Sequence, residues 1–260
     1  MRLLALPAFA DNYIWALSDT AGCAVIVDPG EAAPVFAAVE HGLQPAAILI
    51  THHHADHCGG VAELRERWPA LPVFAPDDAR IETATTRVGE GDCIDLIGLP
   101  FQILSVPGHT LSHIAFHHAG NDGGEGHLFC GDTLFSLGCG RLFEGSPAQM
   151  LASLERLAAL PALTAVCCGH EYTRANAAFA LAVEPDNAAL RQRSQEVTAM
   201  RENGRPTLPS SIAVERACNP FLRVDVPAVR TAIAHRLGRE PVDRTEAFAE
   251  LRRWKDGFRA

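Results

Sequence analysis

The chain has 260 residues, of which 48% are hydrophobic and 20% are charged, so its composition excludes disordered and fibrous proteins. Its 31 acidic and 22 basic residues give a net charge of −9, with no basic stripe. Nucleic acid is therefore not an expected partner, because nucleic-acid binding depends on clustered cations. At ~100–200 residues per domain, the length allows one large domain or two modest ones.

The sequence contains no membrane-spanning or secretory segment that we can identify. No run of ~18 apolar residues occurs, and Asp11 and Asn12 interrupt the N-terminal apolar stretch before it can act as a signal peptide. The eight cysteines show no CxxC or framework spacing, and several lie inside apolar runs. These features predict reduced, buried cysteines in a cytoplasmic protein that does not bind membranes.

Short strand-like and helical segments alternate through the first two-thirds of the chain. Strands are predicted at 12–17, 23–28, 46–51, 73–76, 93–98, 101–107, 113–118, 127–132 and, as the last strand, 163–170. Helices are predicted at 32–42, 61–68 and 147–160. This alternation predicts mixed sheets with helices on their outer faces.

The last third of the chain has a different sequence pattern, with longer amphipathic segments of helical period and more charged residues. Helices are predicted at 173–184, 187–203 and 247–258, and prolines punctuate the connections between them. We therefore predict two domains, a first at 1–172 and a helical one at 173–260.

The segment THHHADH carries four metal-capable side chains within a span of six residues: His52, His54, Asp56 and His57. The segment follows the apolar run AAILI, so it stands at the C-terminal end of a buried strand. Residues two apart in an extended chain point the same way, which places His52 and His54 on one side. Because unpaired imidazoles and carboxylates are costly to bury, a metal site is favoured over a solvated polar turn. His53 points away from its neighbours and is expected to lie outside the ligand set.

Three further candidates each follow another strand-like run: His109 after LSVPG, Asp132 after HLFCG and His170 after AVCCG. Together with the histidine segment, they place metal-capable side chains at the ends of four strands, which is how α/β folds build their sites. Seven side chains exceed the three or four ligands of one zinc ion and suit two ions ~3.5–4 Å apart that share a carboxylate. Nitrogen-rich ligation favours zinc or iron over magnesium or calcium.

The segments THHHADH, PGHT, GDTLF and GHEYT resemble the metallo-β-lactamase superfamily. Four further segments narrow the likeness to the glyoxalase II family, the hydroxyacylglutathione hydrolases: FSLGCGRLFEG (135–145), GHEYTRANAAFA (169–180), NPFLR (219–223) and RRWKD (252–256). The resemblance implies an α+β protein, with an αββα sandwich followed by a C-terminal α-helical domain.

The same resemblance assigns the seven candidate ligands to two divalent metal ions. One ion would be held by His52, His54 and His109 and the other by Asp56, His57 and His170, with Asp132 bridging the two. Zinc is the expected metal, and iron and manganese are the alternatives.

The resemblance also implies hydrolysis of S-D-lactoylglutathione and related 2-hydroxyacylglutathiones to D-lactate and glutathione. A hydroxide between the two ions would attack the thioester carbonyl, since zinc-bound water has a pKa near ~7. Asp56, which would orient the hydroxide, and the bridging Asp132 are the expected catalytic residues. A thiol with a pKa of ~8.5 leaves without a general acid, so a thioester suits this chemistry better than an amide.

The family's glutathione-binding residues map onto Cys139, Arg141, Phe143, Tyr172, Arg252 and Lys255. Glutathione is anionic, and an acidic protein must recruit it with local cations. Arg252 and Lys255 are three residues apart on a predicted helix and therefore share a face. Phe143 stands where some relatives carry Tyr, and Arg141 stands where relatives carry Lys, so these two contacts differ from the family pattern.

Four other functions remain open at this point, and one of them is another thioesterase of the same superfamily. A persulfide dioxygenase of the same superfamily would use a single iron and lack a comparable helical domain. A non-catalytic scaffold would not need all seven ligands, and a nucleic-acid-processing relative conflicts with the net charge of −9. The expected partner is a small-molecule glutathione thioester. No long heptad or exposed apolar helix is evident, so a monomer is expected.

Overall fold

The computed structural model describes residues 1–120 and 126–259 of the chain. They form two compact units, and each unit collects several segments of the sequence. The first unit comprises Met1–Ser105, Ser112–Gly131 and Cys167–His170, and the second comprises Val106–Leu111, Asp132–Val166 and the chain from Glu171 onward. These units divide the chain by spatial contact rather than by sequence order, so the domain boundary expected near residue 172 stays a prediction.

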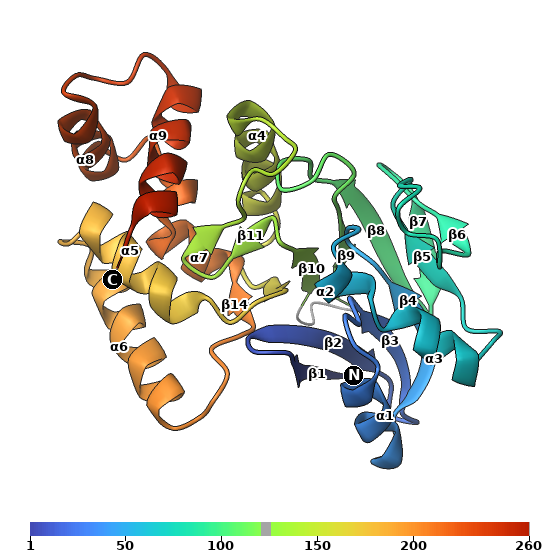
Figure 1. The fold of residues 1–260 in the computed structure, drawn as a ribbon. Coiled ribbons are helices and arrows are strands. Elements are labelled where there is room, and N and C mark those ends of the chain that lie inside the picture. Colours follow the sequence, from blue (N-terminus) through green and yellow to red (C-terminus); the bar gives the residue numbers. More distant parts are fainter. Residues whose placement is uncertain (121–125, 260) are drawn as a thin grey trace. The chain divides into compact units, whose positions relative to one another are not determined.

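The first unit contains a six-stranded sheet with the strand order β1-β2-β3-β4-β5-β6 (Figure 1). Its strands are β1 (Arg2–Ala8), β2 (Asn12–Ser18), β3 (Cys23–Val27), β4 (Gln44–Leu49), β5 (Val73–Ala75) and β6 (Thr86–Arg87). The first three strands pair antiparallel, whereas β3 to β6 pair in parallel. Short turns suffice for the antiparallel part, but parallel neighbours need crossover connections. Helices α1 (Ala33–Glu40) and α3 (Val61–Arg67) supply two of these crossovers.

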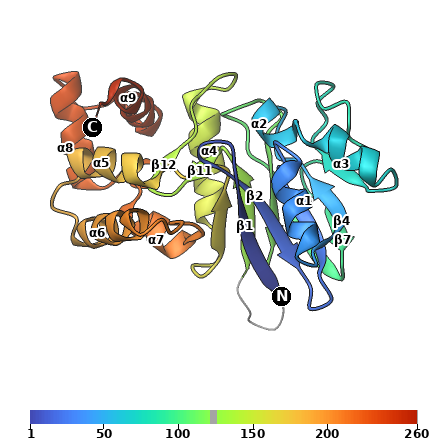
Figure 2. The same cartoon turned by 60° about the horizontal axis from the view of Figure 1, so that its bottom comes forward.

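Helices α1 and α3 cover one face of this sheet (Figure 2). Val35 of α1 and Leu64 of α3 pack with Ile26 and Ile48 of the central strands, and all four side chains are buried. Every residue of β2 is buried, so its other face is covered as well. The central strands of the sheet are therefore buried on both faces, which explains why their sequences are continuous apolar runs.

Strand β1 lies outside the strands that we predicted from the sequence. It pairs antiparallel with β2 in full register, from Arg2↔Ser18 to Ala8↔Asn12. Pro7 is tolerated there because β1 is an edge strand, and an edge strand does not need every N–H for a ladder. An apolar N-terminal stretch with a proline has no local signal that separates such an edge strand from a loop.

A second sheet in the first unit has the order β13-β10-β9-β8-β7. Its strands are β7 (Cys93–Leu96), β8 (Leu99–Ser105), β9 (Ile114–His118), β10 (His127–Gly131) and the end of β13 (Ala165–Cys168). The meander from β7 to β10 is antiparallel throughout. Trp15 of β2 links the two sheets, because its indole Nε1 donates to the carbonyl oxygen of Cys168 at 2.9 Å.

The second unit is largely helical. Its helices are α4 (Pro147–Ala158), α5 (Thr173–Val183), α6 (Ala188–Glu202), α7 (Ile212–Cys218), α8 (Pro227–Leu237) and α9 (Arg244–Gly257), with a 3₁₀ turn at Pro220–Leu222. A short hairpin of β11 (Leu134–Phe135) and β12 (Gly138–Cys139) completes it, with β14 (Ser210–Ser211) paired to the beginning of β13. The sequence predicted that the strand at 163–170 is the last one. This prediction is wrong, because β14 follows β13 in the chain.

Some helices of the second unit were predicted from the sequence, and others were not. Ser146 and Gln149 form a capping box at the start of α4, with Pro147 in the first turn, as the sequence pattern indicates. Helices α7 and α8 were not predicted. Helix α7 is short, and α8 buries only Val229 and Ile233, so it has no pronounced apolar stripe to detect. No helix in the described ranges is long and apolar enough to cross a membrane.

Two histidines on neighbouring strands make the stability of the first unit sensitive to acid. Burial lowers the pKa of His117 and lowers that of His127 to about 4, with the nearby His118 adding to both shifts. The unfolded chain, with an ordinary histidine pKa of ~6.5, therefore takes up these protons first. The free energy of unfolding must fall as the pH drops from about 6.5 toward 4.

We predict that His127→Gln flattens this decline by up to ~1.4 kcal/mol per pH unit, the slope that one proton contributes. Urea unfolding of both proteins between pH 4.5 and 7 measures the difference. His235→Gln, a change at an exposed position of α8, is the matched control and should leave the slope unchanged. Equal slopes for the wild type and His127→Gln would contradict the prediction.

Candidate metal centre

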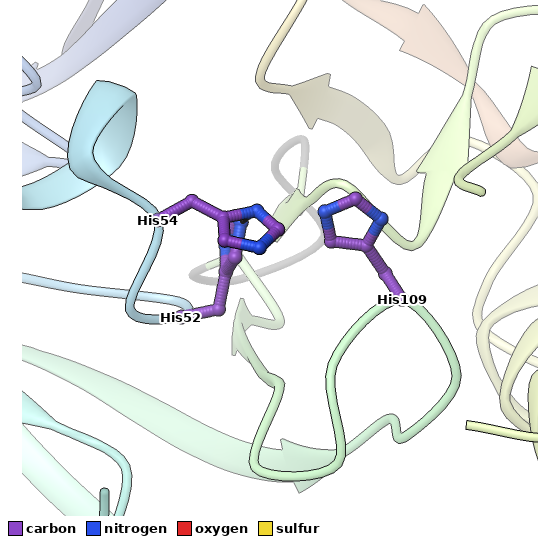
Figure 3. Close-up of side chains that lie close together, drawn as sticks. All are labelled: His52, His54 and His109. Atoms are coloured by element: carbon purple, nitrogen blue, oxygen red, sulfur yellow. Dashed lines mark hydrogen bonds between the residues drawn. The ribbon is translucent and has the colours of Figure 1, made fainter. Parts of the chain in front are cut away.

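Five of the seven candidate ligands belong to the first unit, and two of them, His52 and His54, lie between β4 and the short helix α2 (Ala55–Cys58) (Figure 3). Nε2 of His52 and Nδ1 of His54 are 3.0 Å apart. Two nitrogens bound to one tetrahedral zinc at ~2.0–2.1 Å stand about 3.3 Å apart, so this pair has nearly the spacing of two ligands of one ion. The ring of His113 stacks on that of His52 at 4.6 Å and 17°, and both residues are fully buried.

Asp56, His57 and His170 form a second group in the same unit. One ligand atom from each lies within 4.8 Å of the others. Oδ2 of Asp56 is 3.6 Å from Nε2 of His57 and 3.4 Å from Nε2 of His170. The Asp56 carboxylate is 43% exposed, whereas both imidazoles are buried, so this group opens to solvent on the side of the carboxylate.

The opposite nitrogens of these imidazoles are held by carboxylates. Nδ1 of His57 is 3.0 Å from Oδ2 of Asp28, and Nδ1 of His170 is 2.8 Å from Oδ1 of Asp11. A carboxylate at Nδ1 favours the tautomer that leaves Nε2 bare, and this is the usual arrangement behind metal-binding histidines. Asn12 also fixes Asp56, because its Nδ2 donates to Oδ2 of that residue at 3.0 Å.

Asp28 organises the histidine segment from the end of the neighbouring strand β3. Its buried carboxylate accepts from both the N–H and the hydroxyl of Thr51 at 2.7 Å, in addition to contacting His57. Its φ of 52° is a left-handed conformation, which Asp adopts more readily than most residues. Asp28 is the last residue of the strand predicted at 23–28, and no role at the metal site was predicted for it. The available signal was an acidic residue directly after a buried strand.

The other two candidate ligands, His109 and Asp132, belong to the second unit. His109 lies on the loop after β8 (Figure 3), and its Nε2 is 3.5 Å from Oδ2 of Asp132. Its Nδ1 is 2.9 Å from the carbonyl oxygen of Arg141, which again directs Nε2 toward the carboxylate. The loop is fastened further by the N–H of Phe143, which donates to the carbonyl oxygen of His109, and the ring of Phe143 meets the imidazole edge-on.

Gly140 is required where the chain passes close to Asp132. A Cβ atom at this position would lie 1.9 Å from the carbonyl oxygen of Asp132 and 3.2 Å from Nδ1 of His109. The N–H of Gly140 also donates to the carbonyl oxygen of Thr133 at 3.2 Å. A side chain here would therefore displace the backbone of a candidate ligand.

All six predicted glutathione-binding residues line one cavity of ≈ 450 Å³ in the second unit, together with His109 and Asp132. Their environments differ. Arg141 and Phe143 are largely exposed, Lys255 is half-buried, and Arg252 and Cys139 are buried. Burial raises the pKa of the Cys139 thiol, so it is poorly suited to act as a nucleophile.

Lys255 is an unusual cation in this cavity. Burial lowers its pKa to about 8, and the charges of Arg252 and Arg141 add to the shift. Its Nζ donates to the carbonyl oxygen of Ala175 at 3.2 Å and lies 5.4 Å from the ring centre of Phe179. The ammonium is therefore held in place, yet its charge can be lost within the range of an ordinary assay.

The hairpin that carries Cys139 is held by side chains that the sequence analysis did not single out. Nδ2 of Asn219 donates to the carbonyl oxygen of Gly138 at 2.9 Å, and the buried carboxyl of Glu215 accepts from the N–H of Leu137 at 2.7 Å. Burial raises the pKa of Glu215. Asn219 belongs to the segment NPFLR, whose likeness to the family was noted without a physical role.

His53 is the histidine of the THHHADH segment that was expected to lie outside the ligand set. His53 lies outside both ligand groups, with its Nδ1 3.5 Å from Oδ2 of Asp78. The four ligand-bearing strands do not belong to one sheet, however. Strand β4 is part of the first sheet, and β8, β10 and β13 are part of the second.

The nitrogen and carboxylate donors, spaced 3.0–3.6 Å apart within each unit, fit zinc or iron better than magnesium or calcium.

Comparison with known proteins gives two adjoining family matches. Residues 11–170 match the Metallo-beta-lactamase superfamily, and residues 171–258 match the Hydroxyacylglutathione hydrolase C-terminus. A hydroxyacylglutathione hydrolase from Xanthomonas euvesicatoria pv. vesicatoria (strain 85-10) is 59% identical over 261 residues, covering 100% of both chains.

Solved structures share the fold. ETHE1 from Myxococcus xanthus aligns with a TM-score of 0.64 and 25% identity over 99% of this chain and 91% of that protein. TTHA1623, solved in a di-iron-bound form, aligns with a TM-score of 0.50 and 33% identity over 65% of this chain and 92% of that protein. These matches confirm the predicted fold class, a metallo-β-lactamase-like fold with a C-terminal helical domain.

We predict that Asp28→Asn weakens the binding of zinc at Asp56, His57 and His170 by ~10–100-fold, because the amide no longer holds the tautomer of His57. Zinc retained per chain, titrated against a competing chelator, measures the change. Asp92→Asn is the control, because this exposed carboxylate accepts from the N–H of Gly89, on a loop that contributes no candidate ligand. Equal zinc retention in Asp28→Asn and the wild type would show that Asp28 does not support the ligands.

A second prediction concerns the close approach of Gly140 to Asp132. Gly140→Ala should lower the metal content and the activity together while the far-ultraviolet circular dichroism stays unchanged, because the new methyl group must push the Asp132 backbone aside. Gly89→Ala is the matched control, because nothing lies within 4 Å of a Cβ at that glycine. Normal metal content in Gly140→Ala would contradict the expected coupling.

Proposed function

Because the chain belongs to the hydroxyacylglutathione hydrolase family of the metallo-β-lactamase superfamily, we propose that it hydrolyses the thioester of S-D-lactoylglutathione and related 2-hydroxyacylglutathiones. The products are D-lactate, or the corresponding 2-hydroxy acid, and glutathione. One observation carries this proposal. The cavity in the second unit joins two candidate metal ligands, His109 and Asp132, with every predicted glutathione contact.

We propose that the seven candidate ligands bind two divalent ions, with Asp132 bridging them. The ligands of the first ion are His52, His54 and His109, and those of the second are Asp56, His57 and His170. The nitrogen-rich donor set supports zinc. The di-iron form of TTHA1623 supports iron as an alternative, and manganese is the other.

When bound, such ions lower the pKa of a coordinated water toward ~7 and stabilise negative charge on a carbonyl oxygen. The chain's own groups do the rest. Oδ2 of Asp56, fixed by Asn12 and open to solvent, accepts a hydrogen bond from the attacking water and orients it. Asp132 holds its carboxylate beside His109 in the wall of the cavity that would receive the thioester. Asp56 and Asp132 are therefore the proposed catalytic residues.

The remaining cavity residues bind glutathione. Arg141, Arg252 and Lys255 supply the positive charge that its carboxylates require, and the exposed rings of Phe143 and Tyr172 offer apolar contact area. Cys139 contributes to the cavity wall. Phe143 lacks a hydroxyl, so its contribution is limited to packing. The glutathione thiolate needs no general acid to leave, because its pKa of ~8.5 makes it a good leaving group.

The test is hydrolysis of S-D-lactoylglutathione by the purified protein, followed by the loss of thioester absorbance, with metals quantified in the same sample. Turnover with about two metals per chain supports the proposal. No turnover in a fully metallated sample rejects this substrate. His54→Ala should lose metal and activity together.

The dioxygenase alternative is not favoured, because the matched C-terminal region at 171–258 belongs to the hydrolases. A single iron per chain, with oxygen consumption on glutathione persulfide, would nevertheless reinstate it. The metal analysis above thus separates the two reactions in one preparation.

A cytoplasmic location and a monomeric state complete the proposal. All eight cysteines are free thiols, and five of them are buried, which suits a reducing compartment. Light scattering should give the mass of one chain, 27.9 kDa. A mass of twice that value would reject the monomer.

We predict that KM for S-D-lactoylglutathione rises as the pH increases through about 8, because Lys255 then loses its charge in the free enzyme. Lys255→Arg should remove this rise, since arginine stays charged, and Lys255→Gln should give a high KM at every pH. The measurement is kcat and KM from pH 6.5 to 9.5, with uncatalysed hydrolysis subtracted. A wild-type KM that is constant with pH would rule out Lys255 as the titrating cation.

A further inference from the structure

Two segments that are far apart in the sequence lie side by side in the first unit, one after β4 and one at the start of β9. The N–H of Ile114 donates to the carbonyl oxygen of Thr51 at 3.0 Å. One residue along each segment, the ring of His113 stacks on that of His52 at 4.6 Å and 17°. The two segments therefore run in opposite directions, and successive residues of one face successive residues of the other.

The next contact in this series runs through Asp78, on the loop between β5 and β6. The hydroxyl of Ser112 donates to Oδ2 of Asp78 at 2.6 Å. Nδ1 of His53 lies 3.5 Å from the same oxygen. One carboxylate oxygen thus links the two segments, one residue beyond the stacked rings.

The carboxylate of Asp78 is itself buried and fixed, with 7% of the residue exposed. Nε and Nη2 of Arg80 donate to its two oxygens, each at 2.8 Å. The fork from Arg80, together with the hydroxyl of Ser112, holds the pKa of Asp78 well below its usual range, so the carboxylate stays charged. The loop is fastened in turn by Arg87, whose guanidinium donates to two of its carbonyl oxygens.

The side chain that this arrangement orients is His52. Its Nδ1 is 3.0 Å from Oγ1 of Thr51, whose hydroxyl donates to Asp28. Because that hydroxyl proton is already used, Oγ1 accepts from Nδ1–H of His52, and Nε2 is left bare beside His54. The stacked ring of His113 limits rotation of the imidazole. The stacking persists only while the two segments keep their positions relative to each other.

We infer that Asp78 is a positioning residue for the metal ligand His52. It acts through Ser112 and His53, neither of which is a predicted metal ligand, by linking the two segments that carry the stacked rings. The inference rests on the proposed function only in that His52 binds a metal ion. It gives the loop between β5 and β6 a task at the metal centre, although this loop contributes no ligand.

The test measures metal release, which needs no substrate. Zinc-loaded wild type and Asp78→Asn are mixed with an excess of a chromophoric chelator, and the rate of zinc transfer is followed. Removing a group that contacts a metal ligand directly costs ~10–100-fold in affinity, and Asp78 acts one residue further away, so we expect release of one zinc to be ~3–10-fold faster. Asp77→Asn is the matched control, because Asp77 is an exposed carboxylate of the same loop, and it should release zinc at the wild-type rate.

Changes at Ser112 test the link from its other side. Ser112→Ala removes the hydroxyl donor and should also release zinc faster, whereas Ser112→Thr keeps a hydroxyl and should restore the wild-type rate. The double variant Asp78→Asn/Ser112→Ala should release zinc no faster than Asp78→Asn, because both changes break one contact. If Asp78→Asn does not fold, the two Ser112 variants carry the test.

A further control separates positioning from a general loss of stability. Ile81→Ala removes a buried side chain of the same loop and measures how much zinc release follows from weaker packing alone. The visible absorption of the cobalt-loaded protein depends on the coordination geometry of the metal. Asp78→Asn should shift these bands, and Ile81→Ala should leave them unchanged.

Several results would overturn the inference. Asp78→Asn would have to release zinc at the rate of Asp77→Asn, or no faster than Ile81→Ala, or Ser112→Thr would have to behave like Ser112→Ala. Inactivity of the metal-loaded wild type toward S-D-lactoylglutathione would instead reject the proposed substrate and leave the zinc-release result standing. A wild-type chain that retained no zinc would overturn both proposals.

Discussion

An imidazole can present one nitrogen to a metal ion in a fixed direction only if its other nitrogen is held, and much of this chain serves that requirement. Asp28 holds His57, Asp11 holds His170, and the carbonyl oxygen of Arg141 holds His109. None of these three partners is a predicted metal ligand. They come from the end of β3, the turn before β2 and the loop after β12. Three distant parts of the sequence must therefore fold before the Nε2 atoms of these histidines are oriented.

The two kinds of partner have different consequences. Asp28 and Asp11 are carboxylates, which raise the basicity of the imidazole they contact and help it to bind a cation. A peptide carbonyl, as behind His109, is a neutral acceptor, and its position depends on the backbone around it. The backbone at 139–141 is held by Arg252, by the close approach of Gly140 and by the hairpin contacts of Asn219 and Glu215. In the second unit, His109 therefore has no carboxylate at Nδ1. Several contacts that fix the backbone of residues 139–141 hold its carbonyl acceptor in place instead.

The sequence predicted the candidate ligands better than the groups that support them. The segment THHHADH has a composition that packing alone does not explain, and His109, Asp132 and His170 stand out because each follows an apolar run. Asp28 also follows an apolar run, but neither it nor Asp11 could be paired with a histidine from the sequence, because only the tertiary fold brings each carboxylate to its imidazole. In the same way, β1 and α8 were not predicted, because an edge strand with a proline and a helix with two buried residues have weak periodicity.

The six residues that the family resemblance predicts to contact glutathione have different environments in the structure. The resemblance places Arg252 and Lys255 together on one helix face, and the structure puts both in the wall of one cavity. Their burial nevertheless gives them different tasks. A buried guanidinium keeps its charge and is stable only with fixed acceptors, so Arg252 is bound to the backbone. A partly buried ammonium can lose its proton instead. The protonation state of Lys255 therefore changes near its pKa of about 8, and its protonated form is accessible to an anion. Burial thus separates two cations of one cavity: Arg252 is fixed to the loop backbone, and the pKa of Lys255 is lowered to about 8.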